Sequence, residues 1–273
     1  MKISSGLAHR ILHRFALDKA PPTLPYLTAI LNAYVQTVPW ESASRIVRRA
    51  QVSETEQCPR WPEEFWEGAL QRGLGGTCFE SNYAFLALLH ALGFEGYLTI
   101  NDMHDYVGCH TATVVQLDRE QWMADAGFPV LAPLQLDAAH PTHAISRWLH
   151  YTALPQPNHA FVLERTPHPA PYMFTVYNTP IADADYRAAT THDYGPNGLF
   201  LQEVNINKVV DGALWRFSTR ELPLHLETFV GEQRIDIPIK GDLDQAAHVI
   251  AAKFGMDEPT LREALAKTLK VAH

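Results

Sequence analysis

The sequence has few cysteines, no long apolar run and fewer basic than acidic residues. Its 273 residues include only three cysteines, an odd number and too few for a disulfide framework. No stretch approaches the roughly 18 uninterrupted apolar residues that a membrane-spanning helix needs. Lysine and arginine number 22 against 30 aspartates and glutamates, and the net charge of −8 argues against binding to a phosphate backbone. We therefore expect a cytoplasmic protein with no nucleic-acid and no membrane partner.

The composition predicts a folded protein with a substantial core. Apolar residues make up 47% of the chain and charged residues 19%, and the length suffices for one large domain or for a few small ones. Helical periodicity dominates about the first 90 residues and the C-terminal end, whereas strand patterns begin near Gly96. The expected strands are 97–100, 111–117, 121–125, 160–164, 174–177 and 214–217. The proline-bearing segments 129–157 and 167–171 are expected to be long loops.

A glycine-rich turn leads directly into a cysteine at the start of an apolar segment. Gly75 and Gly76 precede Cys78, and Thr77 and Glu80 have the spacing of a capping box, which predicts that a helix begins here. The free N–H groups and the positive end of the helix dipole favour an anion, so we expect a lowered pKa and more reactive thiolate at Cys78. The alternative is that Cys78, like most free cysteines, is an inert buried residue.

A thiol nucleophile needs a base, and the base needs a group that orients it. His110 lies just before the strand pattern of 111–117, and Asp125 ends the pattern of 121–125. The link 118–120 reads as a turn, so an antiparallel hairpin would bring His110 and Asp125 together at its open end. A carboxylate bonded to one imidazole nitrogen would leave the other nitrogen for the thiol. The alternatives are a solvent-exposed histidine, one of 14 in the chain, and an ordinary turn carboxylate.

A third interpretation of this region is a metal site. Its ligands would be Cys78, Cys109, His104 and His110. Because the chain has no Cys-x-x-Cys pair of the kind that zinc sites use, we expect no metal.

Three separated motifs resemble those of the arylamine N-acetyltransferases. They are a Gly-Gly-x-Cys-x-Glu-x-Asn pattern that ends at Asn82, a histidine before strand residues at His110, and an aspartate with Gly-Phe close behind at Asp125. Further upstream, the similar segments are Arg14 to Leu17, Pro22-Thr23-Leu24, and Val38-Pro39-Trp40-Glu41, the last resembling the family's Val/Ile-Pro-Phe-Glu-Asn motif. The resemblance covers about residues 8–130, with its motifs in the family's order.

The resemblance implies an α+β fold in three parts. These are an N-terminal helical bundle, a β-barrel-like middle domain and a C-terminal α/β lid, around a catalytic core like that of papain-like and transglutaminase enzymes. The helical domain would span residues 1–94 and carry the cysteine. The barrel-like domain would span 95–200 and carry the histidine and the aspartate, and the lid would span 201–273.

The resemblance also implies a ping-pong acetyltransferase. Cys78 would take an acetyl group from acetyl-CoA as a thioester, His110 would be the base and then the acid, and Asp125 would orient it. The partners would be the CoA thioester and a small arylamine, hydrazine or hydroxylamine. An amide synthase, a transglutaminase-like acyltransferase or a cysteine hydrolase would use the same triad with another acyl donor, and this alternative stays open.

The resemblance assigns four further residues to the site. Phe128 and Gly127, in the loop after the aspartate, would bind substrate. Glu41 and an arginine before the glycine pair would brace the site, and the nearest such arginine is Arg72.

Overall fold

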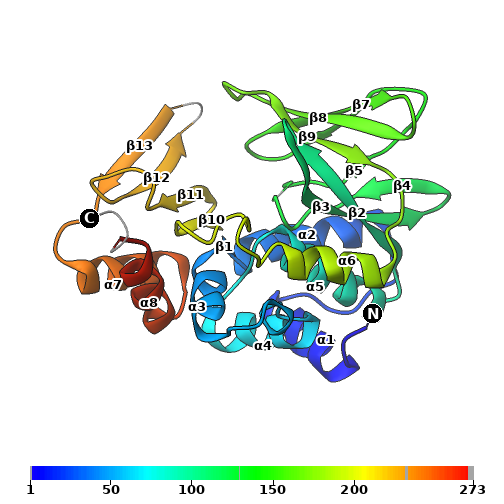
Figure 1. Ribbon diagram of the computed structural model, residues 1–273. Helices are drawn as coiled ribbons and strands as arrows, with labels where there is room; N and C mark the ends of the chain where they lie inside the picture. Colours follow the sequence, from blue (N-terminus) through cyan, green and yellow to red (C-terminus); the bar gives the residue numbers. More distant parts are fainter. Residues whose placement is uncertain (1, 129, 231–232, 270–273) are drawn as a thin grey trace.

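The computed structural model describes residues 2–128, 130–230 and 233–269 (Figure 1). The helices are α1 (Ser5–Arg14), α2 (Leu24–Thr37), α3 (Ala43–Gln51), the short 3-10 helix η1 (Thr55–Gln57), α4 (Pro62–Arg72), α5 (Cys78–Ala91), α6 (Asp183–His192), α7 (Leu243–Phe254) and α8 (Glu258–Leu269). Among the described residues, no helix is both long and apolar enough to cross a membrane.

The larger sheet has eight strands and is barrel-like. Its strands are β2 (Glu95–Met103), β3 (Tyr106–Leu117), β4 (Glu120–Met123), β5 (Leu134–Gln135), β6 (Thr142–Ile145), β7 (His150–Gln156), β8 (Ala160–Thr166) and β9 (Tyr172–Tyr177). The order across the sheet is β5-β4-β3-β2-β9-β8-β7-β6. The hydroxyl of Thr142 on one edge strand donates to the carbonyl of Gln135 on the other, so the two edges nearly meet.

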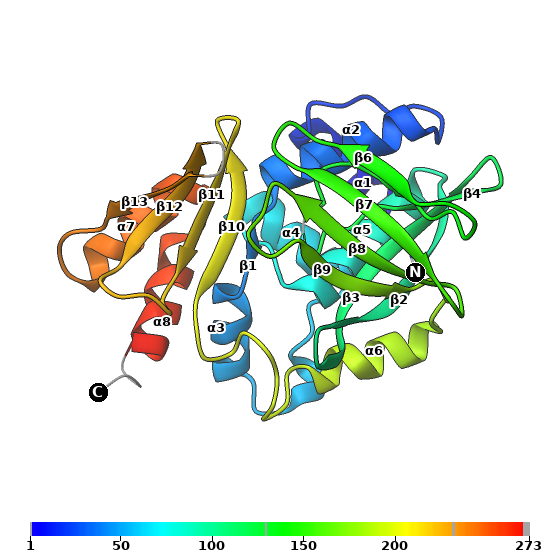
Figure 2. The ribbon, with the colours of Figure 1, turned by 90° about the horizontal axis from the view of Figure 1, so that it is seen from above.

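The smaller sheet joins the two ends of the chain. It runs β1-β10-β11-β12-β13, where β1 is Trp40–Glu41 and the others are β10 (Asn205–Val210), β11 (Ala213–Ser218), β12 (His225–Val230) and β13 (Gln233–Pro238). Helices α7 and α8 pack with this sheet and with α3 in one apolar cluster, and Figure 2 shows the small sheet beside the larger one. Strand β1 therefore ties the N-terminal helices to the C-terminal sheet.

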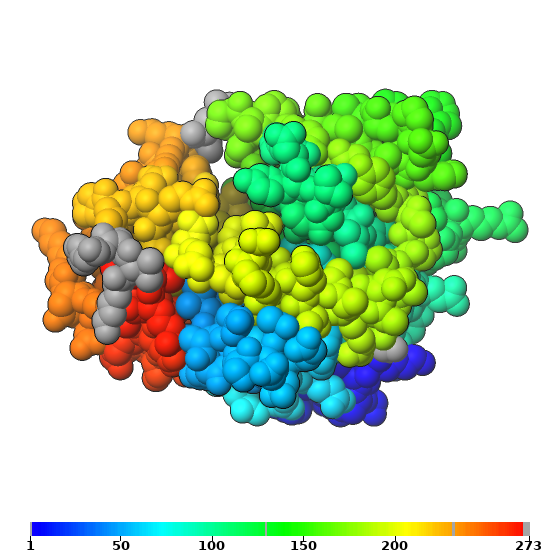
Figure 3. All heavy atoms as spheres, viewed as in Figure 1, coloured from blue at the N-terminus to red at the C-terminus, as the bar shows by residue number. Residues whose placement is uncertain are grey.

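Helix α5 lies at the centre of the structure. Every residue from Cys78 to Leu89 is buried, which explains why this segment shows almost no polar face in the sequence. The helix packs against α4 on one side and against β2 and β3 on the other (Figure 1). The larger sheet thus supports one side of α5. Figure 3 shows a depression in the surface between the green part formed by that sheet and the yellow part around residue 200.

The expected mixture of helices and strands is confirmed, with two corrections. Residues 129–157 do not form a long loop, because β5, β6 and β7 lie within residues 130–157, and residue 129 lies outside the described residues. Strand β6 alternates only between half-buried and exposed residues, and β7 contains a proline, so neither has the apolar pattern that marks a strand in sequence. Helix α6 and strands β10, β12 and β13 were also not predicted.

Candidate active site

Cys78 is the first residue of the central helix α5. Thr77 is the N-cap in an extended conformation, and Cys78 is 6% exposed. The Cys78 thiol points to the carbonyl of Cys109 on β3, at 3.6 Å, and the Thr111 hydroxyl donates to the Cys78 carbonyl at 3.0 Å. The start of α5 is thereby fixed against the strand that carries His110.

The predicted hairpin is confirmed, and it brings His110 and Asp125 together. Strands β3 and β4 are antiparallel, and His110 Nε2 lies 2.7 Å from Asp125 Oδ2. The other carboxylate oxygen, Oδ1, accepts from Asn82 Nδ2 at 2.9 Å and from the backbone N–H groups of Gly127 and Phe128 at 2.7 and 3.1 Å. These three donors stabilise the ionised carboxylate, which in turn directs the N–H of the imidazole toward itself.

The histidine is enclosed by aromatic rings. The His110 ring is 2% exposed, lies 4.3 Å from the ring of Phe174 and meets Phe128 edge-on at 6.1 Å. Burial on this scale strengthens the polar interactions of the imidazole, because little water competes for them. With Nε2 held by Asp125, the ring atom left for the thiol is Nδ1.

Gly127 packs directly on the cysteine. A Cβ added to Gly127 would lie 2.5 Å from Cys78 Cα and 2.4 Å from Asn82 Nδ2, closer than any ordinary non-bonded contact. The loop after β4 therefore needs glycine here so that its backbone can approach the start of α5. The two residues that we expected to bind substrate, Gly127 and Phe128, lie beside Cys78 and His110 respectively.

The electrostatics of the thiol differ from the expectation. Burial raises the pKa of the Cys78 thiol well above its ordinary value, and the charges of Asp193 and Asp125 and the neighbouring Cys109 raise it further. The helix N-terminus acts in the opposite direction, but the cost of burying a thiolate outweighs it. The prediction of a lowered pKa for the Cys78 thiol is therefore wrong.

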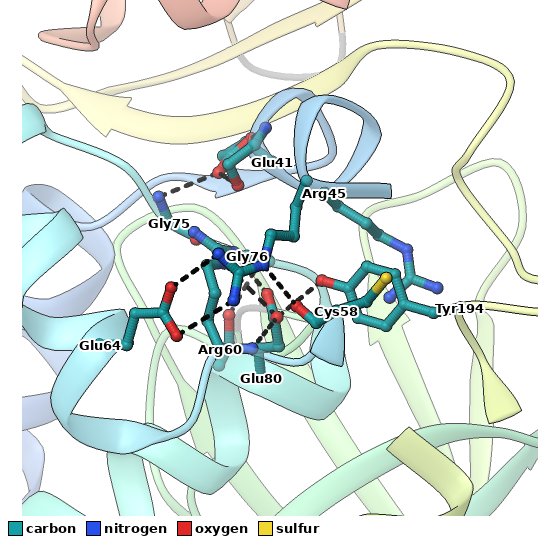
Figure 4. A network of polar contacts seen from close by, with 12 residues as sticks. Glu41, Arg45, Cys58, Arg60, Glu64, Gly75, Gly76, Glu80 and Tyr194 are labelled. Atoms are coloured by element: carbon teal, nitrogen blue, oxygen red, sulfur yellow. Dashed lines mark hydrogen bonds and ion pairs between the residues drawn. The ribbon is translucent and has the colours of Figure 1, made fainter. Parts of the chain in front are cut away.

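Below Cys78, a buried ion pair takes the place of the predicted capping box. Thr77 makes no side-chain cap bond, and Glu80 turns to Arg60, which donates its backbone N–H at 2.8 Å and also pairs through its guanidinium. The hydroxyl of Tyr194 donates to Glu80 at 2.7 Å (Figure 4). Arg60 also donates to the carbonyl of Gly75 at 2.8 Å, so this network holds the loop that leads to Cys78.

Glu41 supports the same loop from the other side. Its carboxylate accepts from the N–H of Gly75 at 3.1 Å and from the N–H of Ser44 at 2.9 Å (Figure 4). Arg72, which was expected to brace the site together with Glu41, lies at the end of α4 and pairs with Asp257 at 3.0 Å. The arginine beside the glycine turn is Arg60.

Two residues of the site escaped the sequence reasoning. Arg60 follows no local pattern that links it to Glu80, 20 residues later. Asn82 does carry a signal, since it lies four residues after Cys78 and hence on the same face of α5. It bridges α5 to Asp125 and also donates to the carbonyl of Thr111 at 2.7 Å.

One cluster in the described part of the chain has a spacing that could hold a metal ion. It consists of Glu221, His225 and Glu227, near the start of β12 and remote in sequence from Cys78. Arg234 lies 2.7 Å from Glu221 and 2.8 Å from His225 Nε2. A guanidinium thus already supplies the positive charge at this place.

Comparisons with known proteins extend the resemblance over most of the chain. A family model described as N-acetyltransferase matches residues 23–257. The arylamine N-acetyltransferase from Salmonella typhimurium is similar with a TM-score of 0.78 and 19% identity, over 97% of this chain and 99% of that chain. No match was found among curated protein sequences.

Two mycobacterial structures agree with this likeness. The arylamine N-acetyltransferase from Mycobacterium abscessus has a TM-score of 0.77 and 20% identity, over 95% of this chain and 94% of that chain. That from Mycobacterium marinum, solved in complex with CoA, has a TM-score of 0.78 and 17% identity, over 96% of this chain and 99% of that chain. At these identities, the structural likeness establishes a shared fold.

Proposed function

Since the chain belongs to the arylamine N-acetyltransferase family and is an acetyltransferase, we propose that it moves an acetyl group from acetyl-CoA to Cys78 and then to a small arylamine or hydrazine. The observation that supports this proposal is that His110 lies 2.7 Å from Asp125, on the strand whose neighbouring residues Cys109 and Thr111 contact Cys78 at the start of α5. The CoA bound to the relative from Mycobacterium marinum supports the choice of donor.

The first half-reaction forms a thioester on Cys78. His110 Nδ1 accepts the thiol proton as Sγ attacks the acetyl carbonyl carbon, and Asp125 stabilises the imidazolium that results. The bond between the acetyl carbon and the CoA sulfur then breaks, and His110 returns the proton to the CoA thiolate. Because burial opposes a free thiolate, proton transfer to His110 has to accompany the attack.

The second half-reaction transfers the acetyl group to nitrogen. The amine attacks the carbonyl carbon of the Cys78 thioester, and His110 accepts one proton from the amine. The carbon–sulfur bond breaks, Cys78 leaves as a thiolate, and His110 protonates it. The products are the acetylated amine and the original thiol. The Cys78 N–H, which opens α5, is a donor for the carbonyl oxygen in both steps.

The remaining expected residues fit supporting roles. Gly127 lets the loop reach Cys78, and Phe128 lines the acceptor side next to His110. Glu41 holds the N–H of Gly75. Arg72 supports the site only from a distance, since it ties the end of α4 to Asp257 near α8.

We also propose the three-part division of 1–94, 95–200 and 201–273, with a papain- or transglutaminase-like core. One strand crosses this division: β1 belongs to the first part of the chain but forms an edge strand of the sheet in the third part. This crossing strand supports a lid that is anchored beside the nucleophile.

The test is the intact mass of the protein after brief mixing with acetyl-CoA. We expect an acetyl adduct on the parent protein and on a Cys58→Ala variant, and none on Cys78→Ala. Cys58 is a suitable control because it is also a buried free cysteine. Addition of an aromatic hydrazine should remove the adduct and give the acetylated hydrazide. An unmodified parent protein whose Cys78 still reacts with a carrier-protein thioester would replace acetyl-CoA by another donor.

A further inference from the structure

Strand β13 is an edge strand of the smaller sheet, and its outer side has no partner strand in the described part of the chain. It pairs with β12 alone. All six of its residues, Gln233 to Pro238, are exposed. Figures 1 and 2 place the strand on the outside of the molecule, away from the larger sheet. Its outward backbone groups can therefore pair with a further strand.

The pairing with β12 determines which backbone groups of β13 point outward. The N–H of Ile239, just after the strand, donates to the carbonyl of Leu224 at 2.9 Å. Because the direction alternates along an antiparallel strand, the odd-numbered residues of β13 bond to β12 and the even-numbered residues face outward. Pro238 falls in the outward set, where its lack of an N–H does not interrupt the sheet. The outward N–H groups thus belong to Arg234 and Asp236.

The charges on β13 select one register for pairing with a copy of itself. Two copies related by a two-fold axis would pair antiparallel. A register centred on Arg234 would oppose two arginines, and one centred on Asp236 would oppose two aspartates, which is unfavourable in both cases. The register centred on Ile235 instead places each Arg234 opposite the Asp236 of the other copy. It also uses every outward N–H of both strands.

The side chains on both faces of β13 suit this register. Arg234 and Asp236 pair with each other at 2.6 Å and remain partly exposed, so each can meet a second partner of opposite charge. On the other face, Ile235 and Ile237 are 38% and 43% exposed, and the pairing would cover one Ile235 with the other. Charged residues usually protect an edge strand from pairing, but here they are complementary when the strand meets its own copy.

We propose that β13 is the surface on which a second copy of this chain docks, so that the two smaller sheets join into one continuous sheet across a two-fold axis. An extended segment of another protein could also add to an edge strand, but the self-complementary charges of Arg234 and Asp236 favour a second copy. A pair of short strands buries less area than a standard interface, so we expect a dimer of modest affinity.

The first test is the molar mass in solution, measured by light scattering after size exclusion at about 1 µM to about 1 mM protein. As the concentration rises, the parent protein should approach twice the chain mass of 30.7 kDa. Arg234→Asp and Asp236→Arg each place like charges across the axis and should weaken the dimer at least about tenfold. An equimolar mixture of these two variants restores opposite charges at every pair and should recover the dimer.

The second test is a disulfide across the axis. In the proposed register Ile235 faces itself in a non-hydrogen-bonded pair with Cα atoms about 4.5 Å apart, which is within the range of a disulfide. Ile235→Cys should therefore form a covalent dimer under mild oxidation. Ile237→Cys is the matched control, because it is similarly exposed on the same face but would lie about 13 Å from its own copy. A non-reducing gel and peptide mapping identify the linked cysteines.

Glu67→Arg reverses a charge in a remote exposed ion pair and should leave the molar mass unchanged. A parent protein that keeps the mass of a single chain at the highest concentration would overturn the proposal. A dimer that survives both charge reversals would place the interface elsewhere, and a mixture of the two variants that stays monomeric would contradict the register. Should a reversal variant not fold, equal cross-linking of Ile235→Cys and Ile237→Cys would overturn the proposal.

Discussion

Gly127 lies so close to Cys78 that a single methyl group at Gly127 would fall 2.5 Å from Cys78 Cα. We expect Gly127→Ala to push the loop after β4 away from α5 and to misplace His110 relative to the thiol. The predicted cost is about 1–3 kcal/mol of stability, as for overpacked cores, with loss of most acetyl transfer. Urea unfolding and the rate of acetyl-adduct formation measure the two effects.

Gly6→Ala is the matched control, since an added Cβ at Gly6 in α1 meets nothing within 4 Å. This substitution should stabilise the protein slightly, because alanine favours a helix over glycine by about 0.5–1 kcal/mol. Normal acetylation by Gly127→Ala would mean that the contact with Cys78 is not needed for catalysis.

Asp125→Asn keeps the shape of the side chain and removes its charge. The His110 imidazolium would then lack its counter-charge, and the tautomer with Nδ1 free would no longer be favoured. We expect kcat to fall by about 10²–10⁴, with an unfolding midpoint close to that of the parent protein. Steady-state acetylation of an aromatic hydrazine measures kcat.

Asp183→Asn is the corresponding control, because the half-exposed side chain of Asp183, at the start of α6, bonds to Tyr83 of α5 and to Arg187 of α6. It should retain nearly full activity. A similar kcat for Asp125→Asn and Asp183→Asn would remove Asp125 from the mechanism.

The pH dependence of thiol alkylation tests the electrostatics of Cys78. Burial and the charges of Asp193 and Asp125 raise the pKa of this thiol, so without a base the thiolate forms only at high pH. In His110→Gln, the rate with iodoacetamide should therefore rise only above about pH 8.5, the value of a free cysteine. The parent protein should already react near neutral pH, because His110 accepts the proton.

Peptide mapping must assign the label to Cys78, since Cys109 lies nearby and is half-buried. Equal alkylation rates of His110→Gln and the parent protein at pH 7 would mean that the start of α5 stabilises the thiolate without the histidine.

The buried pair of Glu80 and Arg60 should dominate the stability of the glycine turn. Glu80→Gln leaves the Arg60 guanidinium, which is 7% exposed, without its counter-charge, and such losses cost about 3–5 kcal/mol. We expect a lower unfolding midpoint in urea and slower acetylation. Glu67→Gln breaks the exposed pair of Arg10 and Glu67 instead and should leave both unchanged, since exposed pairs contribute little. Equal midpoints for the two variants would contradict this ranking.

The hairpin that joins His110 to Asp125 was predictable because the residues that specify it are close together in the sequence. The strand residues alternate, and the turn between them is short, with positive φ at Asp118 and Arg119. Register then fixes which residues meet at the open end. The start of α5 at Cys78 was predictable for the same reason.

The contacts that could not be predicted from the sequence depend on tertiary structure. Thr77 and Glu80 have the capping-box spacing, but Glu80 meets the buried Arg60, which is a stronger partner than a backbone N–H. Helix α6 has no clear apolar face in sequence, and it is placed by Tyr186, whose ring stacks on Tyr83 of α5 at 5.3 Å. The spacing of residues along the chain does not show which of these distant side chains will be in contact.

Strand β1 determines when the active site can be completed during synthesis. Trp40 and Glu41 pair with Asn207 and Ile206, and Trp40 also forms a parallel bridge with Gly76, two residues before the nucleophile. During synthesis, the ribosome completes the cysteine, histidine and aspartate long before β10 emerges. The pairing of β1 with β10, which supports the glycine turn, therefore cannot form until the last third of the chain has been synthesised. A nascent chain released before that point would contain the complete triad but would not be a functioning enzyme.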